Sequence, residues 1–196
     1  MSAAAEAIRL ALDLMHVPSR LKLIRYQPLP VGVGILLRIA AGEEDACEQA
    51  VGLTGRSRSD VRRAAAFFIE QMMFMPDASS YRVLGVRPDA STIELRRNMA
   101  LLLRWLHPDA NSEQSALYAG RVTRAWDDLK TPERRRAYDH TWQRTQQQQR
   151  KGSSLRQLRQ ASRLSILKPE DQERRDAQDA GELRAALRSL FPGDED

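Results

Sequence analysis

Cysteine is almost absent from this chain of 196 residues and occurs once, at Cys47. A single cysteine excludes an internal disulfide framework and any zinc site built from paired cysteines, because both need at least two sulfur atoms. Cys47 lies in a stretch with helical periodicity, where an unpaired cysteine usually serves as a small buried side chain. We therefore predict a structural thiol, no metal site and no cofactor.

Long apolar runs are also missing. The N-terminal residues include Glu6, Arg9 and Asp13, where a secretory signal would need an uninterrupted apolar stretch. The most apolar run, residues 28–42, is too short to span a bilayer and contains Arg38. The sequence therefore predicts no membrane partner, and we expect a cytoplasmic location.

Charge of one sign is concentrated in one segment instead of being spread over the chain, whose net charge is +5. Residues 141–168 hold seven basic and no acidic side chains, whereas residues 169–196 hold four basic and nine acidic ones. A nucleic-acid-binding domain would instead show a basic face across a folded region. This distribution disfavours nucleic acid as a partner.

The last part of the chain has little apolar periodicity. The sequence QRTQQQQRKGSS is of low complexity. Leu183, Leu187 and Leu190 line one face of a short helical segment further on. We predict that residues 141–196 are a Gln/Arg-rich linker followed by an acidic, partly disordered helical tail.

Strand-like alternation is absent, and the periodic segments repeat with helical spacing. Four helices are expected near the N-terminus, at about 3–15, 31–41, 43–51 and from a cap at Ser57 or Ser59 to about Met75. The sequence AAAFFIEQMMFM, residues 64–75, is apolar on every side, so this helix must be buried on more than one side. We predict an all-α protein in which residues 1–77 form a small N-terminal helical domain.

Two further segments carry apolar stripes of equal length. The first stripe consists of Leu95, Met99, Leu102 and Leu106, and the second consists of Tyr118, Val122, Ala125 and Leu129. Ser91 and Glu94 have the spacing of a capping box at the start of the first helix. Two such helices joined by a short polar loop predict an antiparallel helical hairpin. A short helix within residues 79–86 precedes the hairpin, and a helix beginning at Thr131-Pro132 follows it.

The loop of this hairpin contains His107, Pro108 and Asp109. Proline has no amide hydrogen and restricts the residue before it, so the preceding helix ends near Leu106. Asp109 and Asn111 can bond to the backbone of their own turn. The pattern therefore holds an imidazole and a carboxylate at the tip of the hairpin. No nucleophile lies nearby in sequence and no other histidine has ligand spacing, so the pattern does not predict an active site.

In this order and spacing the segments resemble a J domain, the module of DnaJ-type co-chaperones. The resemblance rests on YRVLGV at residues 81–86, the amphipathic helix, the His-Pro-Asp tripeptide, the Ala125-Trp126 helix and the sequence TPERRRAYD. It assigns residues 78–140 to the J domain. The zinc-binding and Gly/Phe-rich regions of the family are absent, so the chain resembles specialised J proteins in which an additional domain selects the client or the location.

J domains bind DnaK-type chaperones and stimulate their ATP hydrolysis without performing chemistry themselves. The resemblance implies that Asp109 forms a charge-assisted contact with an arginine of the chaperone, while Pro108 fixes the turn and His107 shapes the loop. Basic residues on the preceding helix would attract an acidic chaperone surface. The expected partner-binding residues are Arg96, Arg97, Arg104, His107, Pro108, Asp109 and Asn111. No catalytic residue is expected.

The sequence departs from the family pattern in the middle of that helix. The family usually has two adjacent basic residues six and seven positions before the histidine, where this sequence has Leu101 and Ala100. Leu101, Leu103 and Trp105 lie off the core stripe, and a free-standing J domain would expose them. We expect part of this apolar patch to pack against the N-terminal domain or against a helix at 179–191, either as a plain domain interface or as a control on access to the chaperone.

Two other functions fit parts of the sequence. A J-like adaptor would bind the chaperone without stimulating its ATPase. Residues 43–75 loosely resemble a helix-turn-helix around Thr54-Gly55, as in a DNA-binding regulator, although much of the second helix is too apolar to lie in a groove. The leading hypothesis is a J-domain co-chaperone, not an enzyme, whose residues 1–77 select a client that the sequence does not name.

Overall fold

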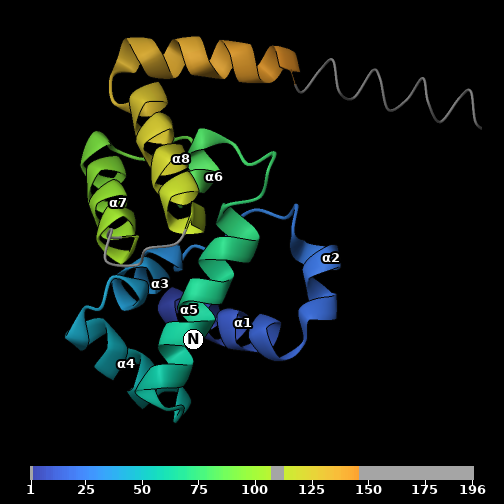
Figure 1. Cartoon of the computed structure of the whole chain (residues 1–196), viewed down its shortest axis with the longest axis vertical. Helices are drawn as coiled ribbons and strands as arrows, with labels where there is room; N and C mark the ends of the chain where they lie inside the picture. The colour runs from blue at the N-terminus through green and yellow to red at the C-terminus, as the bar shows by residue number, and fades with distance from the viewer. Residues whose placement is uncertain (1, 107–112, 146–196) are drawn as a thin grey trace, which may run out of the picture. The chain divides into compact units, whose positions relative to one another are not determined.

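The structure is a computed structural model that describes residues 2–106 and 113–145. Within these ranges every regular element is a helix and no strand occurs, which confirms the predicted all-α fold. The helices are α1 (Ala3–His16), α2 (Leu21–Ile24), α3 (Val33–Ala40), α4 (Glu44–Thr54), α5 (Arg58–Phe68), α6 (Ser80–Val83), α7 (Thr92–Trp105) and α8 (Glu113–Leu129) (Figure 1). A 3-10 turn at Pro18–Arg20 leads into α2, a π-helical stretch at Ile69–Met73 extends α5, and residues 132–145 form a further helix.

The residues up to Trp142 form one compact unit, which includes both the predicted N-terminal domain and the predicted J domain. The predicted boundary between an N-terminal domain and a J domain at residue 77 therefore stays a prediction. The second unit, Gln143–Asp196, lies almost wholly outside the described residues, and so does the predicted acidic tail.

Serine and threonine side chains cap the start of several helices. Ser57 accepts a hydrogen bond from the amide of Asp60 at 3.1 Å, so Ser57 and not Ser59 caps α5. Ser91 accepts one from the amide of Glu94 at 3.2 Å, as the capping-box spacing predicted. Thr131 accepts one from the amide of Arg134 at 3.3 Å and begins the helix at 132–145. These oxygens satisfy amide groups that have no partner within the first turn.

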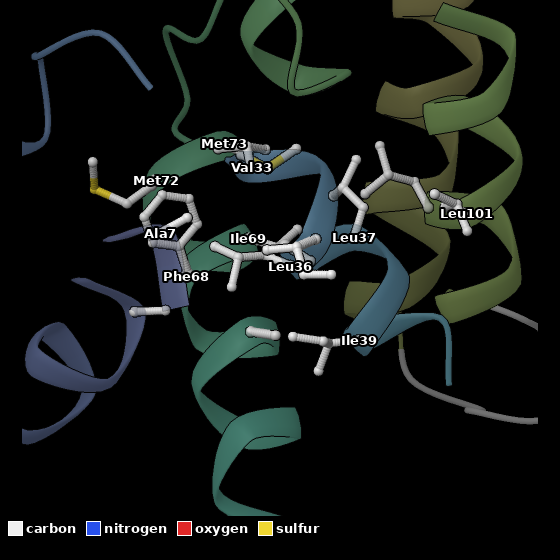
Figure 2. Close-up of a cluster of buried hydrophobic side chains, with 14 of the residues drawn as sticks. Ala7, Val33, Leu36, Leu37, Ile39, Phe68, Ile69, Met72, Met73 and Leu101 are labelled. Carbon is white, nitrogen blue, oxygen red and sulfur yellow. The ribbon is translucent and has the colours of Figure 1, made fainter. Parts of the chain in front are cut away.

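The predicted apolar helix near Met75 continues beyond Phe68 as the π-helical stretch. Phe68 and Ile69 are fully buried, and Figure 2 shows them among side chains of α1 and α3, including Ala7 and Leu36. The prediction that this helix is buried on more than one side is confirmed.

The hairpin of α7 and α8 is packed by the two predicted stripes. Leu95, Leu102 and Leu106 are buried on α7, while Met99 is half-buried. Val122, Ala125 and Leu129 are buried on α8, and Tyr118 is half-buried. Asn98 is the polar exception in this region, because its buried amide donates to the carbonyls of Leu84 and Gly85. The side chain thereby ties α7 to the end of α6.

The N-terminal helices and the predicted J domain meet closely at Gly85. The residue has a φ of 64°, a left-handed conformation that favours glycine. A Cβ atom there would lie 3.0 Å from both Met73 Cε and Val33 Cγ1. Glycine therefore serves twice, because it allows the turn after α6 and leaves room for the N-terminal helices.

Candidate functional site

The candidate site is the end of the hairpin where α7 stops and α8 starts. Trp105 is the last residue of α7, and Glu113 is the first of α8. His107, Pro108, Asp109 and Asn111, which were predicted to bind a partner, lie outside the described residues. The structure therefore describes the two helices that flank the tripeptide. It also describes the three arginines of α7 that were predicted to bind a partner.

Arg96 lies on the open face of the hairpin. Its side chain is exposed, and its guanidinium carbon is 6.0 Å from the centre of the Trp126 ring on α8. A cation above an aromatic ring is attracted by the negative face of that ring, so Trp126 restrains Arg96 without neutralising it. The positive charge of Arg96 remains available to a partner.

Arg97 and Arg104 lie at the border with the N-terminal helices. A Cβ atom added to Gly34 on α3 would lie 3.8 Å from Nη2 of Arg97. Nη1 of Arg104 is 3.8 Å from Oε1 of Glu43, which precedes α4. A pair at this distance is weak. Glu43 also pairs with Arg38 at 2.6 Å, so it offsets little of the positive charge of Arg104 next to the tripeptide.

The apolar patch on α7 packs against the N-terminal helices, which is one of the two expected arrangements. Leu101 is only 5% exposed and lies on the side of α7 that faces Leu37 of α3 (Figure 2). Trp105 stacks on Phe74, with ring centroids 6.3 Å apart. Leu103 is half-buried against the same core. The alternative partner of this patch, a helix at 179–191, lies outside the described residues.

Two arginines of the predicted J domain bind backbone carbonyls at the end of the π-helical stretch. Arg82 of α6 donates to the carbonyl of Met72 at 2.6 Å, and Arg121 of α8 donates to the carbonyls of Phe74 and Met75. The last carbonyls of a helix lack partners and carry partial negative charge, so guanidinium groups stabilise them. Burial lowers the pKa of both arginines, but guanidinium stays protonated in proteins.

Sequence reasoning missed these two arginines. A long basic side chain on a short helix looks like a solvated surface residue, and nothing in its neighbours identifies a distant carbonyl as its acceptor.

The helix at 132–145 is fixed to the start of α6 by polar side chains. The Tyr138 hydroxyl accepts from the amide of Ser80 at 2.7 Å, and the Tyr81 hydroxyl donates to Asp139 at 2.9 Å. Ser80 also donates to Asp128 of α8 at 2.7 Å. Burial, with the neighbouring Asp139 carboxylate, raises the pKa of Tyr81 well above its usual value, so this hydroxyl stays a donor. These bonds hold the hairpin in a fixed relation to α6.

Cys47 is buried, as predicted. Its Sγ atom accepts a weak hydrogen bond from Arg62 Nε at 3.5 Å. Among residues 2–106 and 113–145, no group of three side chains could hold a metal ion. In the same ranges, no helix has the length and apolar character needed to cross a membrane.

Comparisons with known proteins agree with the geometry of this hairpin. The family model described as "DnaJ domain" matches residues 79–139. The chain is 44% identical over 59 residues to the chaperone protein DnaJ of Tropheryma whipplei, a match that covers 30% of this chain and 17% of that protein. It is 41% identical over 64 residues to DnaJ homolog subfamily C member 14 of Rattus norvegicus, covering 32% of this chain and 9% of that protein. No solved structure matches.

A third relative, the curved DNA-binding protein of Coxiella burnetii, is 40% identical over 60 residues, covering 30% of this chain and 19% of that protein. The chain thus spans less than a fifth of the length of these relatives, and the matches fall in the J-domain region. J-domain proteins are co-chaperones and not enzymes, and their general partner is a DnaK-type chaperone. Residues 79–139 therefore form a J domain, the module of DnaJ-type co-chaperones.

Proposed function

We propose that this chain binds a DnaK-type chaperone through the loop at His107, Pro108 and Asp109 and stimulates its ATP hydrolysis in the cytoplasm. In this proposal the N-terminal helices select the client or the location. The observation that supports it best is the packed hairpin, in which α7 ends two residues before the histidine and α8 begins four residues after the aspartate. The chain itself performs no chemistry.

The proposed mechanism is recognition followed by a change in the chaperone. The Asp109 carboxylate would accept charge-assisted hydrogen bonds from an arginine of the chaperone, which fixes register more strongly than a neutral contact. Pro108 would restrict the turn that presents the carboxylate. Arg96 would raise the rate of encounter with an acidic chaperone surface.

The N-terminal helices leave only part of α7 open to such a partner. Leu101 is buried under them and Arg104 lies near Glu43, whereas Arg96 is exposed beside Trp126. The chaperone would therefore approach on the Arg96 side of the hairpin.

The proposal is tested by single-turnover ATP hydrolysis on a purified DnaK-type chaperone. Addition of the full chain is expected to accelerate hydrolysis in a saturable manner. A chain that binds the chaperone, as shown by a direct affinity measurement, but does not accelerate hydrolysis would be the J-like adaptor instead. No acceleration and no binding would contradict both functions.

Reversing the charge of Arg96 tests which face of the hairpin is used. Arg96→Glu is expected to raise the chain concentration needed for half-maximal stimulation by about three- to tenfold at low salt. The difference between the variant and the unchanged chain should shrink as salt screens the charge. The matched control is Arg87→Glu, which changes the net charge equally at an exposed site in the turn between α6 and α7. Equal weakening by both variants would show that net charge, and not the Arg96 face, controls the encounter.

A DNA-binding role for the N-terminal helices has little support from the geometry of α4 and α5. Val61 and Phe68 of α5 are buried, so that side of the helix cannot enter a groove. Arg58 and Arg62 pair with Glu44 of α4, which makes this surface mixed in charge instead of basic.

A further inference from the structure

The segment 17–31 exposes large apolar side chains although it is held firmly in place. Leu21 is buried and Ile24 packs against the core, so these two residues anchor α2. Leu23 and Tyr26, three residues apart on the outer side, are 77% and 74% exposed, and Val31 is 82% exposed. A surface helix normally presents polar residues on its outer side. We call the exposed side chains of residues 17–31 the 17–31 surface.

The charges on the 17–31 surface have one sign. The segment contains Arg20, Lys22 and Arg25 and no acidic residue. Asp13 of α1 lies 4.0 Å from Nη1 of Arg20, and both side chains are well exposed. Such a pair offsets little of the positive potential. The surface therefore combines apolar and aromatic groups with basic ones whose charge is only weakly offset.

The backbone of this surface is fixed by the J domain. Arg82 of α6 donates to the carbonyls of Arg25 at 2.7 Å and Gln27 at 2.8 Å, in addition to that of Met72. Pro28 and Pro30 restrict the chain that follows. A surface that is already ordered loses little conformational entropy when it binds, so it is suited to recognition.

We propose that the 17–31 surface is a docking site for an acidic segment with apolar side chains on a target protein. Leu23 and Tyr26 would enter an apolar contact, and the exposed Arg20 and Lys22 would pair with acidic side chains at its rim, as in protein interfaces with an apolar centre and a polar border. The role of the 17–31 surface in delivering a target to the chaperone rests on the proposed function, whereas binding of the acidic segment to this surface does not.

The position of the surface suits simultaneous binding of target and chaperone. In Figure 1, α2 lies at one side of the view and α7 at the other, with α5 between them. A segment docked on α2 would leave the Arg96 side of the hairpin open. Because Arg82 belongs to α6, the docked segment would also keep a fixed position relative to the J domain.

An anionic membrane is a weaker match for the same chemistry. Interfacial binding normally uses a long amphipathic helix, whereas α2 has four residues. Three basic side chains also give only marginal attraction to a lipid surface. We therefore assign the 17–31 surface to a protein partner, and lipid binding becomes one outcome of the test.

The test measures binding of fluorescent synthetic peptides to the full chain. One peptide carries glutamate and leucine at helical spacing, and its counterpart has lysine in place of glutamate. The glutamate peptide is expected to bind, and the double variant Leu23→Ser with Tyr26→Ser should weaken that binding by about tenfold or more. The variant Arg20→Glu with Lys22→Glu should weaken it severalfold. Ile93→Ser on α7, a matched control at a side chain that is 83% exposed, should bind like the unchanged chain.

The docking proposal would be overturned by equal binding of the lysine peptide, by unchanged binding of the glutamate peptide to the Leu23 and Tyr26 variant, or by binding of anionic phosphatidylserine vesicles without binding of the glutamate peptide. Self-association that is lost in the same variant would make a second copy the occupant and would also overturn it. Stimulation of the chaperone ATPase without peptide should be unchanged in the Leu23 and Tyr26 variant and in the Arg20 and Lys22 variant. A failure of the proposed function can therefore be told apart from a failure of the docking proposal.

Discussion

Replacing Leu101 with arginine is expected to lower the free energy of unfolding by about 3 kcal/mol or more. Leu101 is 5% exposed, lies on the side of α7 that faces α3 (Figure 2) and packs among the apolar side chains of the core. A guanidinium placed there would lose its hydration without gaining a partner. In a free-standing J domain the same change would restore the basic residue that is usual in the family, and it would be harmless.

The matched control for this variant is Ala100→Arg. Ala100 precedes Leu101 on α7 and is exposed, so the same added charge remains in water and should change the free energy of unfolding by no more than about 0.5 kcal/mol. Urea denaturation of both variants, followed by circular dichroism, measures the difference. Equal stability of the two variants would contradict the packing of α7 against α3.

Hydrogen exchange tests the same interface without a substitution. The backbone amides of residues 99–106 should exchange more slowly in the full chain than in an isolated fragment of residues 79–140, because the fragment lacks α3 and Phe74. Equal protection in both would show that the N-terminal helices do not support α7. A fragment that does not fold would leave the urea comparison as the deciding measurement.

Burial of Leu101 also affects what the J domain can offer to a partner. The middle of α7 is covered by the N-terminal helices, and Leu101 belongs to the same core as Leu37 and Met73. Exposure of this face would require a large part of that core to open. We therefore favour a permanent domain interface over a control on access to the chaperone.

The helices of this fold could be predicted from sequence because their signals are local. Ser91 has a capping partner three residues away, and Leu102 has stripe neighbours one turn away, so a short window of sequence contains the whole pattern. The unusual apolar character of Leu101 and Trp105 was also visible, because both lie off that stripe. Their partners were not, since the packing of α7 against α3 and the stacking of Trp105 on Phe74 join surfaces far apart in the chain.

The polar contacts between the N-terminal helices and the J domain could not be predicted. Arg82 and Arg121 both donate to backbone carbonyls, and a carbonyl is present at every residue whatever the side chain. No residue type at the acceptor therefore reveals the pairing. The π-helical stretch that presents Met72 and Phe74 to these arginines has no sequence signature either.

Asp109→Asn is expected to abolish stimulation of the chaperone ATPase, a larger functional effect than that expected for Arg96→Glu. The substitution keeps the size of the side chain but removes its charge, so the proposed contact with an arginine of the chaperone loses its ionic partner. Loss of one partner from a desolvated charge pair costs about 2–5 kcal/mol of binding, which corresponds to roughly 30-fold to several thousandfold in affinity. Asp89→Asn is the matched control, because Asp89 is an exposed aspartate in the turn between α6 and α7.

Single-turnover ATP hydrolysis by a purified DnaK-type chaperone, measured with the unchanged chain, Asp109→Asn and Asp89→Asn at equal concentrations, tests the co-chaperone account most directly. The account predicts acceleration by the unchanged chain and by Asp89→Asn, and the basal rate with Asp109→Asn. Equal acceleration by the unchanged chain and Asp109→Asn would contradict it.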